Sequence, residues 1–397
     1  MDKRLAFVVA TAAALAVGPA FGSGFAFYEQ GAKASGQAGA WVARADDASA
    51  NWYNPAALAF MSGRELQFGV NYLDVGSDTK LVTGIGTFDA ISNVETPAQI
   101  YFSQKINDRV AWGVGVNNPF GLATEWPSPV SQFSKRAELV TYLINPNIAF
   151  KLHEYWSLGI GLDYLTAEVH EFSRDIAVPP TTSNLTGEGD AIGYNAALAF
   201  RHAGFSIAGT YRSGFTPKIN GQIRFSGAAG NLFNSSATAA IDLPSEATIA
   251  VAWSTKRFDV ETDAYHTAWN SFQSLIIQTP SPLTSVSLVE NWKAVWAYRL
   301  GLAFRIDQEG HHEIRAGAYV DQSPVPTQYL RPSIPDSDRT GYSLGYGWQG
   351  KKFGIDVYAM RLDFDDVTAT GTPADGVLPG TYQTSINLFG GTFKYRF

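Results

Sequence analysis

The chain has 397 residues, a formal net charge of −7, 45% hydrophobic residues and no cysteine. This acidic balance argues against nucleic-acid binding, which depends on a basic surface that neutralises phosphates. Without cysteine the chain can form no disulfide, and it cannot be a lipoprotein, whose anchor requires a cysteine at the mature N-terminus.

The first residues have the pattern of a secretory signal peptide. A charged start at residues 2–4 precedes an apolar run from Leu5 to Val17, which ends in a small-residue site at 20–22. A charged start, a short apolar core and small residues before a cleavage point define an export signal rather than a membrane helix, the alternative being a buried N-terminal helix. We expect residues 1–22 to be removed and the mature chain to begin at Ser23.

Residues 23–63 form a second segment with a different character. They are rich in glycine, alanine and an Asn-Pro pair, and they lack the alternation of a strand. The segment is too long for a linker and too apolar for a disordered tail. It therefore needs a protected environment, which the rest of the chain must supply.

From residue 64 onward, apolar and polar residues alternate with period two, as in strands that have one apolar face. In one such stretch the apolar face carries Trp292, Ala294, Trp296, Tyr298, Leu300, Leu302, Phe304 and Ile306. The opposite face carries Lys293, Arg299, Gly301, Arg305 and Asp307. No stretch beyond the signal approaches the roughly 18 apolar residues of a membrane helix. A membrane protein of this kind must be a closed barrel.

Fourteen such segments follow one another, and an even number is typical of bacterial barrels. They begin near Leu66, Thr96, Val110, Ala137, Trp156, Gly189, Phe205, Ala237, Phe258, Trp292, Glu313, Thr340, Phe353 and Tyr382. Tight turns alternate with long loops between them, as periplasmic turns and external loops do. We predict an all-β fold, a transmembrane antiparallel barrel of 14 strands over residues 64–397, with residues 23–63 as a plug in its lumen. The alternation slips near Tyr358, which predicts a bulge there.

The last residues place Phe389, Gly391, Phe393, Tyr395 and Phe397 on one face and end on an aromatic carboxy-terminus. This pattern resembles the terminal signal by which outer-membrane barrels are recognised for assembly, the alternative being an ordinary amphipathic strand. It predicts the bacterial outer membrane as the location, and outer-membrane lipids and the barrel assembly machinery as partners.

Several blocks of sequence resemble one known family. They are residues 24–30, 35–38 and 45–48, the triplet Asn54-Pro55-Ala56, residues 118–126 (Asn-Pro-Phe-Gly-Leu-Ala-Thr-Glu-Trp), residues 241–244 and residues 315–339. Together and in this order they resemble the FadL family of outer-membrane fatty-acid and hydrocarbon transporters. The resemblance spans the whole mature chain.

The resemblance implies a function and a set of site residues. The function is passive uptake of hydrophobic small molecules, which bind an external groove, pass an N-terminal hatch and leave sideways through the barrel wall. The hatch and internal ligand pocket would involve Phe25, Phe27, Asn54, Pro55 and Ala56. The lateral opening and external groove would involve Asn118, Pro119, Phe120, Gly121, Leu122 and Trp126. The protein would act as a monomer, without a cofactor.

Three arginines on lumen faces stand near acidic residues of adjacent strands: Arg299, Arg305 and Arg315. The first interpretation is a charge ladder that stabilises the barrel wall. The alternative is that one of them binds the carboxylate of a fatty acid.

Other chemical signals are weak. The adjacent residues His311 and His312 point to opposite sides of a turn and have no spaced ligands to complete a metal site. Asp46 and Asp47 fit the packing of the plug better than acid catalysis. Residues 345–350 match a dinucleotide pattern, but no helix follows them. No nucleophile with base and orienter can be assembled, so we expect no enzyme and no metal. The alternatives to a transporter are a general diffusion porin and a non-transport barrel such as an adhesin or lipase.

Overall fold

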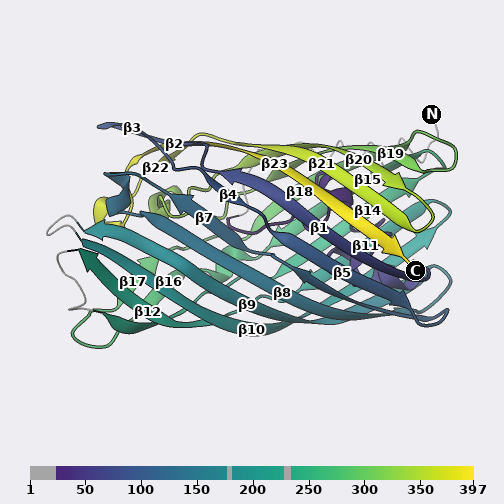
Figure 1. The fold of residues 1–397 in the computed structure, drawn as a ribbon, viewed down its shortest axis with the longest axis horizontal. Coiled ribbons are helices and arrows are strands. Elements are labelled where there is room, and N and C mark those ends of the chain that lie inside the picture. Colours follow the sequence, from purple (N-terminus) through teal and green to yellow (C-terminus); the bar gives the residue numbers. More distant parts are fainter. Residues whose placement is uncertain (1–23, 177–180, 228–233) are drawn as a thin grey trace.

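The computed structural model describes residues 24–176, 181–227 and 234–397. The predicted signal peptide lies outside these residues. Antiparallel strands run obliquely around an elongated cylinder (Figure 1). Among the described residues fourteen of them pair in a ring: β1 (Arg64–Val75), β5 (Ala98–Lys105), β6 (Val110–Asn117), β8 (Arg136–Lys151), β9 (Trp156–Ile176), β10 (Thr181–His202), β11 (Phe205–Arg212), β14 (Glu246–Ser254), β15 (Phe258–Thr267), β18 (Val295–Arg305), β19 (His312–Asp321), β20 (Arg339–Gln349), β21 (Phe353–Phe364) and β23 (Gly380–Arg396).

The ring closes because β23 pairs with β1 along most of its length, from Glu65 opposite Arg396 to Leu73 opposite Leu388. Closure pairs the first strand of the ring with the last, so neither presents a free edge to the membrane, where an unsatisfied backbone group is costly. The predicted 14-stranded antiparallel barrel is confirmed.

Shorter strands extend the wall at the end that carries the long loops, on the left in Figure 1. They are β2 (Asp78–Thr83), β3 (Gly86–Asp89), β4 (Asn93–Glu95), β7 (Gly121–Glu125), β12 (Lys218–Gly227), β13 (Ser235–Ala240), β16 (Ser274–Gln278), β17 (Val286–Val289) and β22 (Val367–Ala369). The other end carries tight turns, such as residues 152–155 and 203–204. Long loops mark the external end of such a barrel and tight turns mark the periplasmic end.

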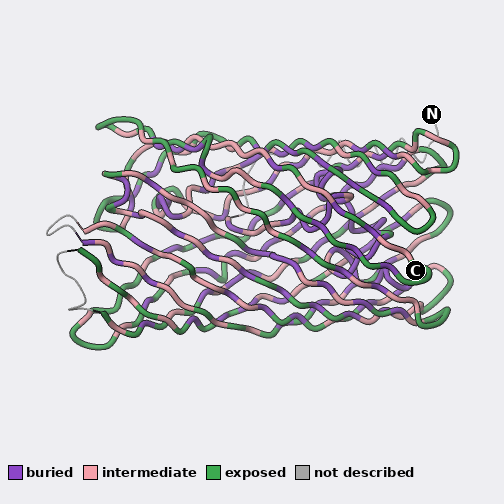
Figure 2. Tube along the Cα trace, in the orientation of Figure 1, coloured by how far each residue is buried: buried purple, intermediate pink, exposed green. Residues whose placement is uncertain are grey.

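Outward and inward residues alternate along the strands (Figure 2). On β1, Leu66, Phe68 and Val70 are exposed while Glu65 and Gln67 are buried. An exposed apolar band of this kind is the surface that a bilayer covers. None of the helices among the described residues is both long enough and apolar enough to span a membrane.

The predicted bulge near Tyr358 is wrong. Strand β21 keeps its register with both β20 and β23 past this residue. The polarity changes because the strand leaves the bilayer: its outer face passes from Val357 to Arg361, while its inner face passes from Asp356 to the buried Leu362. Irregular pairing occurs instead between β8 and β9. There Glu138 lies opposite Glu171 and the next residue, Leu139, lies opposite Val169, so His170 has no partner in the register.

Trp292 also differs from the prediction, which placed it on the lipid face of a strand. Strand β18 begins only at Val295, and Trp292 is buried inside the molecule. The chain enters the strand from an external loop, so this indole joins the interior before the alternation begins.

Residues 24–63, which we call the N-terminal segment, lie inside the barrel toward its periplasmic end (purple in Figure 1). The segment contains three short helices, α2 (Ala32–Ser35), α3 (Ala50–Tyr53) and η1 (Pro55–Phe60). Its backbone is bonded to strands on different sides of the wall. Ala32 N donates to Thr392 Oγ1 of β23, Ala38 N donates to Ser343 Oγ of β20, and Asn51 O accepts from Asn145 Nδ2 of β8.

Glycines on the inner wall make room for this segment. A Cβ at Gly317 would overlap the backbone at Gln37, and a Cβ at Gly159 would overlap the backbone of Pro55 and Ala56. The small residues that alternate with apolar ones in the sequence therefore serve close approach of the segment to the wall.

Candidate functional site

The third barrel strand is interrupted at residues 118–120, between β6 and β7. Below the interruption β6 pairs with both β5 and β8. Above it, β7 pairs with β8 alone among the described strands, with Gly121 opposite Val140. The sequence explains the break, because Pro119 has no N–H to donate to a ladder. The wall therefore lacks a continuous ladder on the β5 side of β7.

The interrupted strand is tied to the beginning of the N-terminal segment. Phe27 N donates to Pro119 O at 2.8 Å, and Gly121 N donates to Phe25 O at 3.0 Å. These bonds form an antiparallel bridge centred on Ala26 and Phe120. Residues 118–120 are thus held inward by pairing with the segment instead of with β5.

A cavity of about 400 Å³ lies at this gap. Apolar groups from both sides of the break line most of it: Phe27, Leu73, Pro97, Phe120, Leu122 and Val140. The lining also includes two carboxyl groups, those of Glu95 and Glu138, and the imidazole of His170. We call this space the lateral cavity.

Next to the lateral cavity, five aromatic residues are linked by ring contacts and form what we call the aromatic cluster: Phe25, Phe120, Trp269, Phe272 and Trp292. The ring centroids of Phe25 and Trp269 are 4.8 Å apart, as are those of Trp269 and Trp292. Both pairs are edge-to-face, an arrangement that aromatic rings prefer. Phe120 belongs both to this aromatic cluster and to the lining of the lateral cavity. The aromatic cluster and the lateral cavity therefore share this side chain.

Comparison with known proteins identifies this architecture. Residues 13–397 match the model of the family described as outer membrane protein transport protein (OMPP1/FadL/TodX). The chain belongs to this family. Its members are transport channels rather than enzymes, and the protein is accordingly a transport protein of the bacterial outer membrane.

Relatives match this chain over nearly its whole length. The long-chain fatty acid transport protein of Escherichia coli strain K12 is 25% identical, with 98% of each chain covered. The 47 kDa outer membrane protein of Pasteurella multocida is 26% identical at the same coverage. A solved Pseudomonas aeruginosa FadL homologue shares the fold with a TM-score of 0.83 and 21% identity, covering 94% of this chain and all of its own. The Pseudomonas putida toluene transporter TodX gives a TM-score of 0.74 at 14% identity, covering 92% and 98%.

The residues predicted for the hatch of this protein fall into two groups. Phe25 lies in the aromatic cluster and Phe27 lines the lateral cavity. Asn54, Pro55 and Ala56 are buried elsewhere in the segment, where Asn54 Nδ2 donates to Val42 O and Pro55 begins η1. The structure therefore does not bring all five residues to one pocket, and their role in ligand binding stays a prediction.

Of the residues predicted for the opening, Asn118 to Leu122 surround the break. Trp126 is separate from them. It is buried under the external loops, where it packs against Leu330 and Tyr382 and its Nε1 donates to Pro332 O at 2.7 Å. It does not line the lateral cavity.

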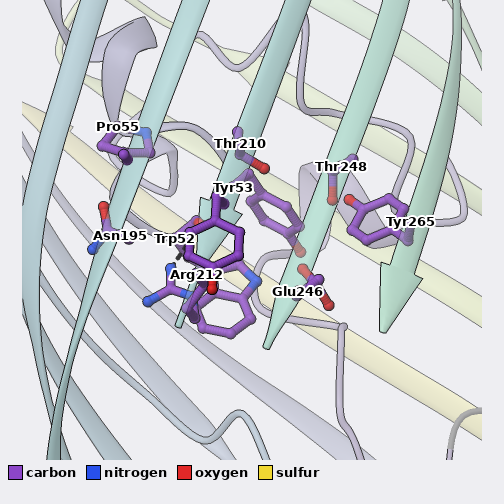
Figure 3. Close-up of a pocket in the computed structure, with 11 residues that line it drawn as sticks. Trp52, Tyr53, Pro55, Asn195, Thr210, Arg212, Glu246, Thr248 and Tyr265 are labelled. Carbon is purple, nitrogen blue, oxygen red and sulfur yellow. Dashed lines mark hydrogen bonds between the residues drawn. The ribbon is translucent and has the colours of Figure 1, made fainter. Parts of the chain in front are cut away.

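A much smaller cavity lies between the N-terminal segment and strands β10 to β15 (Figure 3). Trp52 and Tyr53 face Arg212 and Glu246 across it. Its volume of about 20 Å³ is enough for a single water molecule. Arg212 is already paired with Asp163 at 2.6 Å and stacks on Trp52 at 4.2 Å. This cavity therefore serves packing rather than binding of a hydrophobic ligand.

The three lumen arginines are engaged within the protein. Arg305 pairs with Asp259, and Arg315 pairs with Glu313 and Asp356, each at 2.6 Å. Arg299 donates to Ala38 O at 2.9 Å. It lies 4.6 to 4.8 Å from three tyrosine rings: Tyr28, Tyr265 and Tyr319. The ion pairs of Arg305 and Arg315 favour the ladder interpretation. Arg299 makes no ion pair with a described residue, and its Nε and Nη2 have no hydrogen-bond partner there, so a carboxylate-binding role stays a prediction.

Sequence reasoning missed Arg44, which ties the N-terminal segment to β15. Arg44 pairs with Glu261 at 2.8 Å and with Asp259 at 3.1 Å, while Trp41 N donates to Asp263. The signal was present: three inward carboxylates at every second position of one strand need partners, and the nearest unassigned cation lay in the segment.

Two carboxyl groups of the external loops are buried beside the site. Asp336 accepts from Gly24 N at 3.0 Å and from Ser323 Oγ at 2.6 Å. Glu290 pairs with Arg331 at 2.6 Å. Burial raises the pKa of both carboxyls to about 7, against the opposing attraction of neighbouring arginines. Asp336 thus holds the first described residue of the N-terminal segment.

The turn of residues 307–311 gathers Asp307, Glu309 and His311 within 4.8 Å of one another. The Asp307 carboxylate accepts from the backbone N–H groups of His312 and His311, and these bonds lower the pKa of Asp307. The arrangement is that of a side chain closing a tight turn.

Proposed function

We propose that the protein mediates passive uptake of hydrophobic small molecules, long-chain fatty acids or hydrocarbons, across the outer membrane, with lateral exit through the break in the third strand. The E. coli relative is named a long-chain fatty acid transport protein, and TodX is named a toluene transporter. The observation that carries the proposal is the lateral cavity at residues 118–121, beside a strand that loses its pairing with β5 there.

The proposed route begins in an external groove and reaches the aromatic cluster, where edge-to-face rings offer an apolar environment. It continues past Phe120 into the lateral cavity and ends in the bilayer. A ligand that leaves sideways avoids the aqueous periplasm, and with it a rehydration cost of about 0.8 kcal/mol per methylene. The N-terminal segment acts as the hatch in this proposal, because it fills the lumen below the aromatic cluster.

The proposal includes the maturation of the chain. Residues 1–22 act as the signal peptide, residues 23–63 as the hatch and residues 64–397 as the barrel. The assembly machinery recognises the terminal strand that ends at Phe397, and the mature protein works as a monomer among outer-membrane lipids. Deleting Phe397 leaves export intact and lowers the amount of assembled barrel.

The route is tested by the double variant Pro119→Thr/Gly121→Val. A Cβ at Gly121 has its nearest neighbour, Leu139 O, at 3.9 Å, so the valine enters open space and fills the cavity without a clash. Gly209→Val on β11 is a matched control, because its Cβ also has a single neighbour at 3.9 Å. We expect uptake of radiolabelled long-chain fatty acid or hydrocarbon to fall at least tenfold in the double variant and to stay normal in the control, in cells lacking their own transporter. Unchanged uptake at equal surface expression would mean that the ligand leaves by another route.

A further inference from the structure

We propose that the lateral cavity passes uncharged ligands in preference to anions, and that Glu95 and Glu138 are the residues that set this specificity. The inference rests on the proposed function, because it assumes that the ligand leaves through this cavity. It narrows the substrate class to alkyl or aromatic hydrocarbons and neutral derivatives such as alcohols, rather than ionised fatty acids.

The lining of the lateral cavity has a one-sided charge. Glu95 and Glu138 contribute carboxylates, and His170 is the basic group; no lysine or arginine lines the cavity within the described part of the chain. Glu138 faces outward on β8, two pleats beyond Tyr142, whose exposed ring marks the upper part of the lipid-facing band. Glu138 therefore stands on the outer side of the wall at the lateral cavity, and Glu95 lines the same cavity.

The cations nearest the exit are already shared among carboxylates. Arg136 lies 2.7 Å from Glu138, 3.1 Å from Glu125 and 3.8 Å from Glu171. His170 lies between Glu138 at 2.9 Å and Glu168 at 3.1 Å. Carboxylates thus outnumber the basic groups around the exit.

Glu95 has no such partner. Its carboxylate makes no ion pair with a described residue, and burial together with the charge of Glu138 raises the pKa of Glu95. The attraction of Arg136 and His170 opposes these two effects without cancelling them, so the surroundings of Glu95 disfavour its charged form. An anionic ligand at the same place would meet the same repulsion.

Two arginines on the interior side of the route, Arg331 and Arg299, do not line the lateral cavity. Arg331, behind Trp292, is held by Glu290 and by the carbonyls of Val289 and Asp375. Arg299 is buried among three tyrosine rings, where its Nε and Nη2 have no hydrogen-bond partner among the described residues. An ionised carboxylate that enters an apolar space without a partner costs several kcal/mol, whereas an alkyl chain or ring gains from burial. The electrostatics of the route therefore favour a neutral ligand.

The test compares two ligands of equal chain length, 1-dodecanol and dodecanoate, at about pH 8, where the carboxyl of the acid is ionised. Initial uptake of each radiolabelled ligand is measured in cells that lack their own transporter and express the full chain. We expect expression to increase dodecanol uptake at least tenfold more than dodecanoate uptake. In Glu95→Gln/Glu138→Gln, the ratio of dodecanoate to dodecanol uptake should rise at least fivefold. Asp108→Asn, which removes one charge from a fully exposed side chain in a periplasmic turn, should leave the wild-type ratio.

The outcomes separate this inference from the proposed function. Equal enhancement of both ligands, or preference for dodecanoate, would overturn the charge selection while leaving lateral uptake in place. A neutral preference that persists unchanged in the double glutamine variant would overturn the assignment to Glu95 and Glu138. If expression enhances neither ligand, the proposed uptake function fails.

Discussion

The two halves of the lumen are built in opposite ways. In the periplasmic half, ion pairs and backbone bonds fix the N-terminal segment to the wall: Lys394 lies 2.7 Å from both Asp47 and Asp356, and Arg44 is held by two acids of β15. In the external half, the part of the interior that adjoins the break is mainly apolar. There the aromatic cluster, the broken strand and the lateral cavity lie together.

This difference assigns distinct tasks to the two halves. Buried ion pairs are specific in geometry and costly to break, so they suit a part of the molecule that must stay in place. Apolar contacts are less directional. A hydrophobic ligand can therefore take the place of a contact between two rings at little cost in free energy. The contacts of the periplasmic half therefore suit the hatch role proposed above, and those of the external half suit a region that exchanges contacts with a ligand.

The strongest way to break the comparison is to remove the central cation of the periplasmic half. In Lys394→Met, the buried carboxylates of Asp47 and Asp356 lose their shared partner. We expect the free energy of unfolding to fall by about 3 to 5 kcal/mol, because Asp47 is left as a buried charge without its ion pair, while Asp356 keeps only its pair with Arg315. Urea unfolding in lipid vesicles measures the loss.

Arg361→Met is the control for this prediction, because the Arg361 ion pairs with Asp78 and Asp363 are exposed. Such surface pairs contribute about 0 to 1 kcal/mol. Similar losses in both variants would show that the polar half of the lumen does not depend on its buried ion pairs.

A substitution in the external half should loosen the backbone at the break in the third strand more than it destabilises the rest of the barrel. Phe25→Ala removes a ring that contacts four other rings of the aromatic cluster. Loss of a packed aromatic side chain costs about 3 kcal/mol, here taken from the attachment of residues 25–27 to residues 119–121. We expect faster amide hydrogen exchange at Phe27 and Gly121, with little change in the strands of the periplasmic half. Uniformly faster exchange around the barrel would contradict the division into two halves.

The sequence predicted the barrel well because its alternation has one physical cause throughout, lipid outside and a packed lumen inside. Where that cause ends, prediction failed. The inner and outer faces of β21 exchange polarity above the bilayer, which produced a false bulge at Tyr358, and Trp292 lies before its strand begins. The alternation shows only which positions are apolar. It does not show whether an apolar side chain faces lipid or packs in the interior formed by the external loops.

The site was predicted less completely for a related reason. Residues 118–122 carry a local signal, Asn-Pro-Phe-Gly, and the break is where that signal is. Trp269 and Phe272 join Phe25 only through tertiary packing, and Glu95 and His170 reach the lateral cavity through β4 and the irregular pairing of β9. No spacing in the sequence records these contacts.

The smallest expected effect concerns the link between the halves, the bond from Gly24 N to the Asp336 carboxylate. The pKa of Asp336 is raised to about 7 by burial, from about 3.9 in an unfolded chain. The folded state therefore binds this proton more tightly, and the stabilisation that results is complete below about pH 4 and is lost as the pH rises through 7. Between about pH 6 and pH 8 the loss is about 1 kcal/mol. Asp336→Asn cannot ionise, so its unfolding should depend less on pH over that range, while Glu290→Gln, at the other loop carboxyl with a pKa of about 7, provides the matched comparison. The measurement is the difference in urea midpoint between the two pH values for the wild type and each variant. If Asp336→Asn kept the full pH dependence of the wild type, Asp336 would not be the group that couples the proton to the anchoring of the N-terminal segment.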